Sequence, residues 1–195
     1  LQDKFYVMPE VDKCRLQESF RTFVANYDKV NIHVEPVCYS TDDTAELAEI
    51  FNGNEALIKK YAEKLSISFE RVEYAKNNFI RVVKVMKAFI LNDSVKSFLC
   101  LNNKLPQENK GLFDIKLLEE FADAIIKLYG IKGLKGKDLL YSINSEDYDA
   151  KRAEFIQRLS KGEKLFVISS YNTVGAGQNL QYKAPGNATI VAVND

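Results

Sequence analysis

The chain has 195 residues, of which 46% are hydrophobic, so it can bury one sizeable core or two small ones. Its 27 lysine and arginine residues are balanced by 27 aspartate and glutamate residues, so the zero net charge predicts no global attraction to a polyanion. The three cysteines are widely spaced and form no C-x-x-C pair, which argues against a disulfide framework and a zinc site. No apolar run approaches the roughly 20 residues that span a membrane. These features predict a soluble protein of the reducing cytoplasm.

The first part of the chain is predicted to be mostly helical. Apolar residues at three- and four-residue spacing predict a helix over residues 11–27, and alternation predicts one short strand over residues 30–34. A second helix should begin at the capping cluster around Asp42 and end at Asn52 and Gly53, and a short amphipathic helix should follow through Leu65. His33 is the only histidine and has no partner at ligand spacing, so no metal site is expected.

A longer helix gives the clearest periodic pattern, and Ser68 is its expected N-cap. Its stripe consists of Phe69, Val72, Lys76, Phe79, Val83, Met86 and Ile90. Residues 59–104 include ten basic residues and four acidic ones, a difference of +6. We interpret the basic residues as a solvated helix face, because Arg81 and Lys84 should project away from the stripe without interleaved aromatic residues for base stacking. Contact with a phosphate backbone is the alternative.

Two further helices are expected before the pattern changes. The first should start at Asp93 or Ser94 and run through Leu101, and the second should begin at the cap Asp114 and end at Gly130. Lysines alternate with glycines over residues 130–137, which we interpret as a flexible, solvated joint.

Strand and helix patterns alternate beyond this joint. Strands are predicted over residues 139–143, 165–169 and 189–193, with a helix over residues 148–159. Such alternation indicates a parallel sheet. The sequence therefore predicts a mostly helical region with one short strand over residues 1–137 and an α/β domain over residues 138–195.

The most informative stretch is K-L-F-V-I-S-S-Y-N-T-V-G-A-G-Q-N-L-Q at residues 164–181. Its apolar block is typical of a strand that is covered on both faces. Hydroxyl and amide side chains follow at once, and open α/β sheets bind their ligands at the carboxyl ends of their strands. Gly175 and Gly177 allow a sharp bend beside these polar groups. The loop after this strand is therefore the candidate site.

This stretch resembles motif V of the superfamily 2 helicases and translocases, most closely the swi/snf-like branch, through G-Q-N-L-Q at residues 177–181. The preceding residues 151–162 resemble the helix R-x-x-(I/F)-(I/L)-x-x-(F/L)-x-x-G of the same domain. The resemblance covers about residues 138–195. It implies part of the C-terminal RecA-like domain, an α/β fold with a parallel sheet, preceded here by the helical region.

The resemblance also implies roles for individual residues. The nucleic-acid-binding part of the loop would be Ser170, Tyr171, Asn172 and Thr173. The nucleotide-binding part would be Gly175, Gly177, Gln178, Asn179 and Gln181. Tyr171 departs from the family pattern, which places a serine or threonine at or next to that position in several branches. No catalytic residue and no metal ligand is assigned.

Other motifs of the family do not occur in this sequence. There is no G-x-x-x-x-G-K-[ST], no Asp-Glu pair after an apolar strand and no arginine-rich motif VI. We therefore expect a fragment of a longer ATP-dependent hydrolase that is inactive alone, with ATP and Mg²⁺ as cofactors of the complete polypeptide. Expected partners are DNA or RNA and the first RecA-like domain, and not a membrane.

Two alternatives remain open from the sequence. The first is a non-catalytic scaffold or protein-interaction module that keeps a degenerate RecA-like domain, because a fold does not guarantee an activity. The second, weaker alternative is a small-molecule enzyme with a doubly wound domain. It would need a general base in the cleft, and the sequence offers no convincing one.

Overall fold

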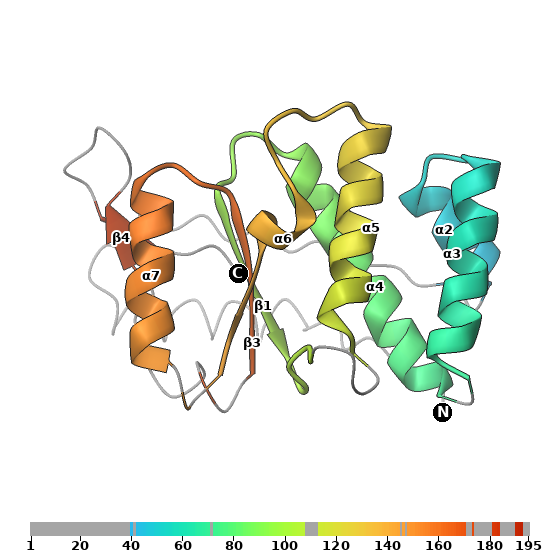
Figure 1. The fold of residues 1–195 in the computed structure, drawn as a ribbon, viewed down its shortest axis with the longest axis horizontal. Helices are drawn as coiled ribbons and strands as arrows, with labels where there is room; N and C mark the ends of the chain where they lie inside the picture. The colour runs from blue at the N-terminus through green and yellow to red at the C-terminus, as the bar shows by residue number, and fades with distance from the viewer. Residues whose placement is uncertain are drawn as a thin grey trace, which may run out of the picture. The chain divides into compact units, whose positions relative to one another are not determined.

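We analysed a computed structural model of the chain (Figure 1). It describes residues 40, 42–70, 72–107, 113–144, 146, 148–170 and 173, and the backbone of residues 181–183 and 190–192. The chain divides into two compact units, residues 1–36 and 37–195, and all described residues lie in the second. The helix predicted over residues 11–27 and the strand predicted over residues 30–34 lie outside the described residues.

The described part begins with the helices α2 (Asp43–Ile50), α3 (Glu55–Ser68) and α4 (Glu73–Leu91). The side chain of Asp42 caps α2 by accepting hydrogen bonds from the backbone N–H groups of residues 44 and 45. Asn52 and Gly53, with φ of 50° and 73°, turn the chain after α2. These observations confirm the helices predicted on either side of that turn.

The predicted start of α4 is wrong. Ser68 is the last residue of α3, and α4 begins only at Glu73, after a turn that contains Phe69. The apolar stripe predicted too early a start for α4, because Phe69 is buried in the same core as Phe79 and Val83 but precedes their helix.

A three-stranded parallel sheet forms the centre of the described unit, in the order β1-β3-β2. Its strands are β1 (Ser97–Asn102), β2 (Leu140–Ile143) and β3 (Leu165–Ser170). This confirms the parallel sheet and the strands predicted near β2 and β3. The helix predicted from Asp93 or Ser94 to Leu101 is wrong, because this segment pairs with β3 along its length, from Ser97 opposite Leu165 to Asn102 opposite Ser170.

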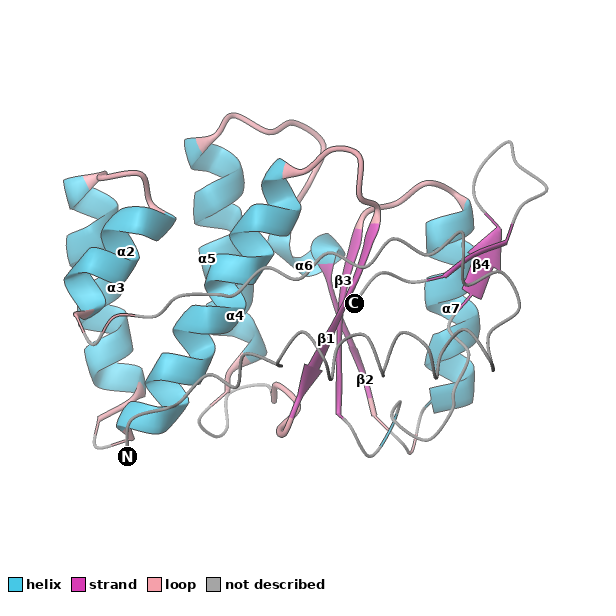
Figure 2. Cartoon of the chain, turned by 180° about the vertical axis from the view of Figure 1, so that it is seen from behind, coloured by secondary structure: helices cyan, strands magenta, loops and turns pink. Residues whose placement is uncertain are grey.

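Helices cover both faces of this sheet (Figure 2). Phe166 and Ile168 of β3 join the core of α4, α5 (Ile115–Leu128) and the short α6 (Gly136–Leu139). Leu165 and Val167 alternate with them and pack with α7 (Tyr148–Ser160) on the other face. The fold is therefore mixed α/β and doubly wound, which agrees with a partial RecA-like fold preceded by helices.

The boundary predicted after residue 137 does not separate two packed units. One core cluster includes Leu47 of α2 and Phe121 of α5 together with Leu140 and Phe166 of the sheet. In addition, β1 precedes residue 137 and forms an edge of the sheet. The sheet domain therefore begins earlier than the sequence suggested, because β1 was mistaken for a helix.

The end of the described chain forms a second, smaller sheet. β4 (Gln181–Lys183) and β5 (Ile190–Ala192) pair in antiparallel fashion, with Gln181 opposite Ala192. The strand predicted over residues 189–193 exists, but it belongs to this pair and not to the parallel sheet. Among the described helices, none has the length and apolar character that a membrane span requires.

Gly136 allows α6 to lie directly against α5. A Cβ atom at this position would be 2.4 Å from the backbone oxygen of Glu119, and the Gly136 N–H donates a 2.7 Å hydrogen bond to Asp123. We expect Gly136→Ala to lower the unfolding free energy by about 1–3 kcal/mol, because the backbone of α5 cannot move aside cheaply. Urea denaturation measures this, and Lys137→Ala, at an exposed neighbour, should change stability by less than about 0.5 kcal/mol. Equal effects of the two variants would contradict the close contact.

Candidate functional site

The carboxyl ends of the three strands bring polar residues to one edge of the sheet. The strands are parallel, so Asn102 of β1, Ile143 of β2 and Ser170 of β3 end at the same edge. Asn102 and Ser170 are direct partners in the register. Asn103 and Asn144 follow β1 and β2. We call these residues, together with Thr173, the carboxyl edge. Its polar side chains carry amide and hydroxyl groups.

The end of the central strand is fixed by hydroxyl groups. Ser169 is fully buried, and its Oγ donates a 3.0 Å hydrogen bond to the backbone oxygen of Ile143. The hydroxyls of Ser170 and Thr173 are 2.9 Å apart, and the Thr173 N–H donates to Ser170 Oγ at 3.3 Å. This bond resembles an N-cap, which is a structural role. One of the two hydroxyl hydrogens forms the bond between these oxygens, so the hydrogen of the second hydroxyl is available to a ligand.

Asn102 is the feature of this edge that the sequence interpretation missed. Its Oδ1 accepts hydrogen bonds from the Asn103 N–H at 2.8 Å and from Asn78 Nδ2 of α4 at 3.3 Å. The residue is 8% exposed, and its Nδ2 donates to no other described residue. A signal was present in the sequence, because the apolar run that ends at Leu101 precedes two asparagines much as Ile168 precedes two serines.

The structure describes only part of the predicted site. It brings Ser170 and Thr173 together. The backbone of Gln181 lies in β4 and outside the parallel sheet. The remaining predicted site residues lie outside the described residues, namely Tyr171, Asn172, Gly175, Gly177, Gln178 and Asn179.

The chemistry of this edge suits binding better than acid–base work. Hydroxyls, amides and backbone N–H groups hold phosphates without reading a base sequence. No group of three or more metal-ligating side chains occurs among the described residues. Burial raises the pKa of the Cys100 thiol to about 11, so this thiol is protonated at neutral pH and is a poor nucleophile.

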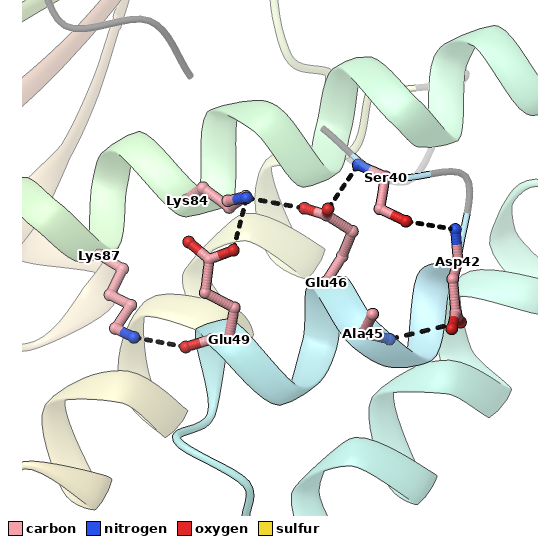
Figure 3. Close-up of polar contacts among 7 residues, drawn as sticks. All are labelled: Ser40, Asp42, Ala45, Glu46, Glu49, Lys84 and Lys87. Atoms are coloured by element: carbon pink, nitrogen blue, oxygen red, sulfur yellow. Dashed lines mark hydrogen bonds and ion pairs between the residues drawn. The ribbon is translucent and has the colours of Figure 1, made fainter. Parts of the chain in front are cut away.

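The basic helix face of α4 is not solvated as predicted. The Lys84 ammonium lies between two carboxylates of α2, at 2.9 Å from Glu46 and 2.7 Å from Glu49 (Figure 3). Lys76 pairs in the same way with Asp43 at 2.6 Å. These lysines were misjudged because their partners on α2 come from a distant part of the sequence. Since α2 neutralises them, they offer no charge to a phosphate backbone.

The fold and the carboxyl edge define a class of protein, the open α/β domains with helices on both faces and polar residues at the carboxyl ends of the strands. Comparison with protein-family models and with curated proteins finds no match to the chain. The functional proposal therefore rests on the sequence pattern and on the geometry of this edge.

Proposed function

We propose that the chain is part of an ATP-dependent superfamily 2 helicase or nucleic-acid translocase, and that the carboxyl edge forms one side of its nucleotide-driven cleft. One observation carries the proposal: the hydroxyl pair of Ser170 and Thr173 lies at the end of the central strand. The motif V-like sequence begins in the same segment. The doubly wound parallel sheet supports this proposal, because such sheets bind ligands where these residues lie.

The hydrogen bonds at the end of β3 suggest how such a loop would work. Ser169 fixes the strand end to β2, and the Ser170–Thr173 pair fixes the first turn of the loop. A loop that starts from so rigid a base can carry a change at the nucleotide to the nucleic-acid backbone, as cleft closure requires. In this proposal Ser170 meets the backbone, whereas buried Thr173 positions it.

ATP and Mg²⁺ belong to the proposal as cofactors of the complete polypeptide. The described residues could contribute neutral donors to a phosphate group, but they include no carboxylate cluster that would hold the Mg²⁺ ion. ATP would supply the free energy for cleft closure. The first RecA-like domain, DNA or RNA, and a cytoplasmic location complete the proposal.

The test is an ATPase assay of the complete polypeptide that contains this chain, with and without single- and double-stranded DNA and RNA. We expect nucleic acid to stimulate hydrolysis. Asn179→Ala should reduce that stimulation by about tenfold, as expected for the loss of a hydrogen bond worth about 1.4 kcal/mol. Gly177→Ala should also reduce it, because the added Cβ restricts the backbone conformations that a sharp bend needs.

Gln157→Ala is the matched control, because it removes an exposed amide of α7 to which the resemblance assigns no ligand contact. Its stimulation should equal that of the unaltered protein. The helicase or translocase proposal would be contradicted if no nucleic acid stimulated ATP hydrolysis. It would also be contradicted if neither loop substitution reduced the stimulation. Absence of any ATPase activity would favour the non-catalytic scaffold instead.

A further inference from the structure

The amino ends of the three parallel strands define a second edge, opposite the carboxyl edge. The segments 91–97, 127–138 and 158–164 enter β1, β2 and β3, and their loops lie along the upper side of Figures 1 and 2. Hydrogen bonds join these segments. The Leu165 N–H donates to the Lys96 oxygen at 2.9 Å, Lys164 Nζ to the Asn92 oxygen at 2.5 Å, and Arg158 Nη2 to the Asp138 oxygen at 2.6 Å. We call these three segments the amino edge.

The amino edge concentrates positive charge. It has eight basic residues and three acidic ones, a net charge of +5. Because the net charge of the whole chain is zero, the remaining residues carry −5. The three acidic residues are Asp93, Asp138 and Glu163. At the carboxyl edge, the charged residues in the described segments that directly follow β1 and β2 are Lys104 and Glu146, and Lys151 donates to the Ser142 oxygen near the end of β2. The lysine excess of the amino edge is not matched there. Charge is therefore segregated between the two edges, although the composition hides it.

Six lysines of this edge are exposed, and none forms an ion pair or side-chain hydrogen bond with another described residue. They are Lys96, Lys127, Lys132, Lys135, Lys137 and Lys161. The two other basic residues are engaged, Arg158 with Glu163 and Lys164 with the last carbonyls of α4. Burial lowers the pKa of Lys164 below its usual range; Asp93 opposes this shift, and the like charge of Lys96 adds to it.

The ordinary explanation for lysines at this edge is the helix dipole. The carboxyl ends of α4, α5 and α7 lie here, and cations are favourable within the last turn of a helix. Lys164 serves this purpose for α4. It does not account for Lys132 and Lys135, which lie between α5 and α6 and donate to no described carbonyl. Lys137 lies in the single turn of α6 and likewise donates to no described carbonyl. Their charge is therefore available to a partner.

We propose that the amino edge binds the phosphate backbone of a nucleic acid through these exposed lysines, without reading its sequence. Ammonium groups spread over three segments of one sheet edge match a polymer with regularly spaced charges. A lipid surface fits less well, because it calls for an exposed apolar face. The large apolar residues exposed here are only Leu91 at 40% and Tyr129 at 37%, and Lys87 lies 5.6 Å from the Tyr129 ring. The inference does not depend on the motor function proposed above.

The test is fluorescence anisotropy of a labelled mixed-sequence DNA duplex titrated with the full chain at several salt concentrations. The variant carries Lys132→Gln, Lys135→Gln and Lys137→Gln. We expect its affinity at low salt to fall at least tenfold. The slope of log affinity against log salt should become shallower by about three, one contact per lysine.

A second triple variant controls for the change in total charge. It carries Lys59→Gln, Lys60→Gln and Lys64→Gln, at three lysines of α3 that lie outside both edges. Its affinity and salt slope should stay unchanged, and circular dichroism should show both variants folded. Three results would overturn the proposal. They are an equal loss of DNA affinity in the two triple variants, no binding of DNA by the unaltered chain, and tighter binding to phosphatidylserine vesicles than to DNA. The assay contains no ATP, so its result is independent of the ATPase test.

Discussion

Replacing Lys84 by methionine should lower the free energy of unfolding by about 3–5 kcal/mol, the range found when one partner of a buried ion pair is removed. The Lys84 side chain is 10% exposed, and that of its partner Glu46 is 5% exposed. Without the ammonium, Glu46 stays buried, and among the described residues the Ser40 N–H, at 2.6 Å, is the one donor left to it. Glu49 loses less, because its side chain reaches water. Urea denaturation at neutral pH measures the effect.

Two variants separate the buried charge from the loss of packing. Lys84→Met combined with Glu46→Gln should recover much of the stability, because no buried charge is left unpaired. Lys87→Met is the matched control on the same helix, since its ammonium contacts the Glu49 backbone oxygen and the Tyr129 ring but pairs with no described carboxylate. It should cost less than about 1 kcal/mol. A similar small loss for Lys84→Met would contradict the buried pair.

The pH dependence gives an independent check on Lys84. Burial lowers its pKa, but the hydrogen bonds to Glu49 and Glu46 outweigh burial and raise the pKa above its ordinary value of 10.5. A raised pKa stabilises the fold fully below the unfolded value, and this contribution disappears as the pH rises through the folded value. The deficit of Lys84→Met should therefore remain constant from neutral pH to about pH 9 and shrink only in stronger alkali.

Local pattern was enough to predict part of this fold. The run around Val167 is short and continuously apolar, and the run around Tyr141 is interrupted only by Ser142; a strand buried on both faces has this composition. The cap at Asp114 and the turn at Asn52 were also readable, because each depends on neighbouring residues alone. The hydroxyls at the end of β3 were found for the same reason.

Long-range pairing decided the features that the sequence did not reveal. The spacing of Phe98, Leu99 and Leu101 suits a helix in a short window, and only pairing with β3 makes this segment a strand. Asn102 was therefore not recognised as an edge residue. Likewise, the burial of Lys84 depends on α2 lying against α4, which no local pattern reports.

The two edges of the sheet differ in the chemistry that they offer. The carboxyl edge presents neutral hydroxyls and amides on strand ends that are held by hydrogen bonds. The amino edge presents exposed ammonium groups on loops. Neutral donors favour geometric discrimination, and point charges favour fast, salt-sensitive attraction. If both proposals hold, attraction of a nucleic acid and its coupling to the nucleotide occur at opposite ends of the same strands.

Phe121→Ala should produce a comparably large loss, about 3–5 kcal/mol of unfolding free energy. The side chain is fully buried at the centre of an aromatic cluster. Its ring centroid lies 4.3 Å from that of Tyr61, 5.5 Å from that of Phe79 and 5.7 Å from that of Phe51. The ring thus joins α5 to α3, to α4 and to the end of α2. Its removal leaves a cavity that three rings would have to close, in addition to the lost burial of the ring itself.

Tyr74→Ala is the matched control, because this aromatic residue of α4 is 74% exposed and should change stability by less than about 0.5 kcal/mol. Tyr61 supplies a local readout. Burial raises its pKa to about 12, and the charges of Glu120 and Asp123 add to the shift. Loss of the Phe121 ring that packs against Tyr61 should leave its phenol less buried and move its pKa back toward 10, which ultraviolet titration of the folded variant detects. If Phe121→Ala and Tyr74→Ala cost the same, Phe121 does not occupy the centre of this core.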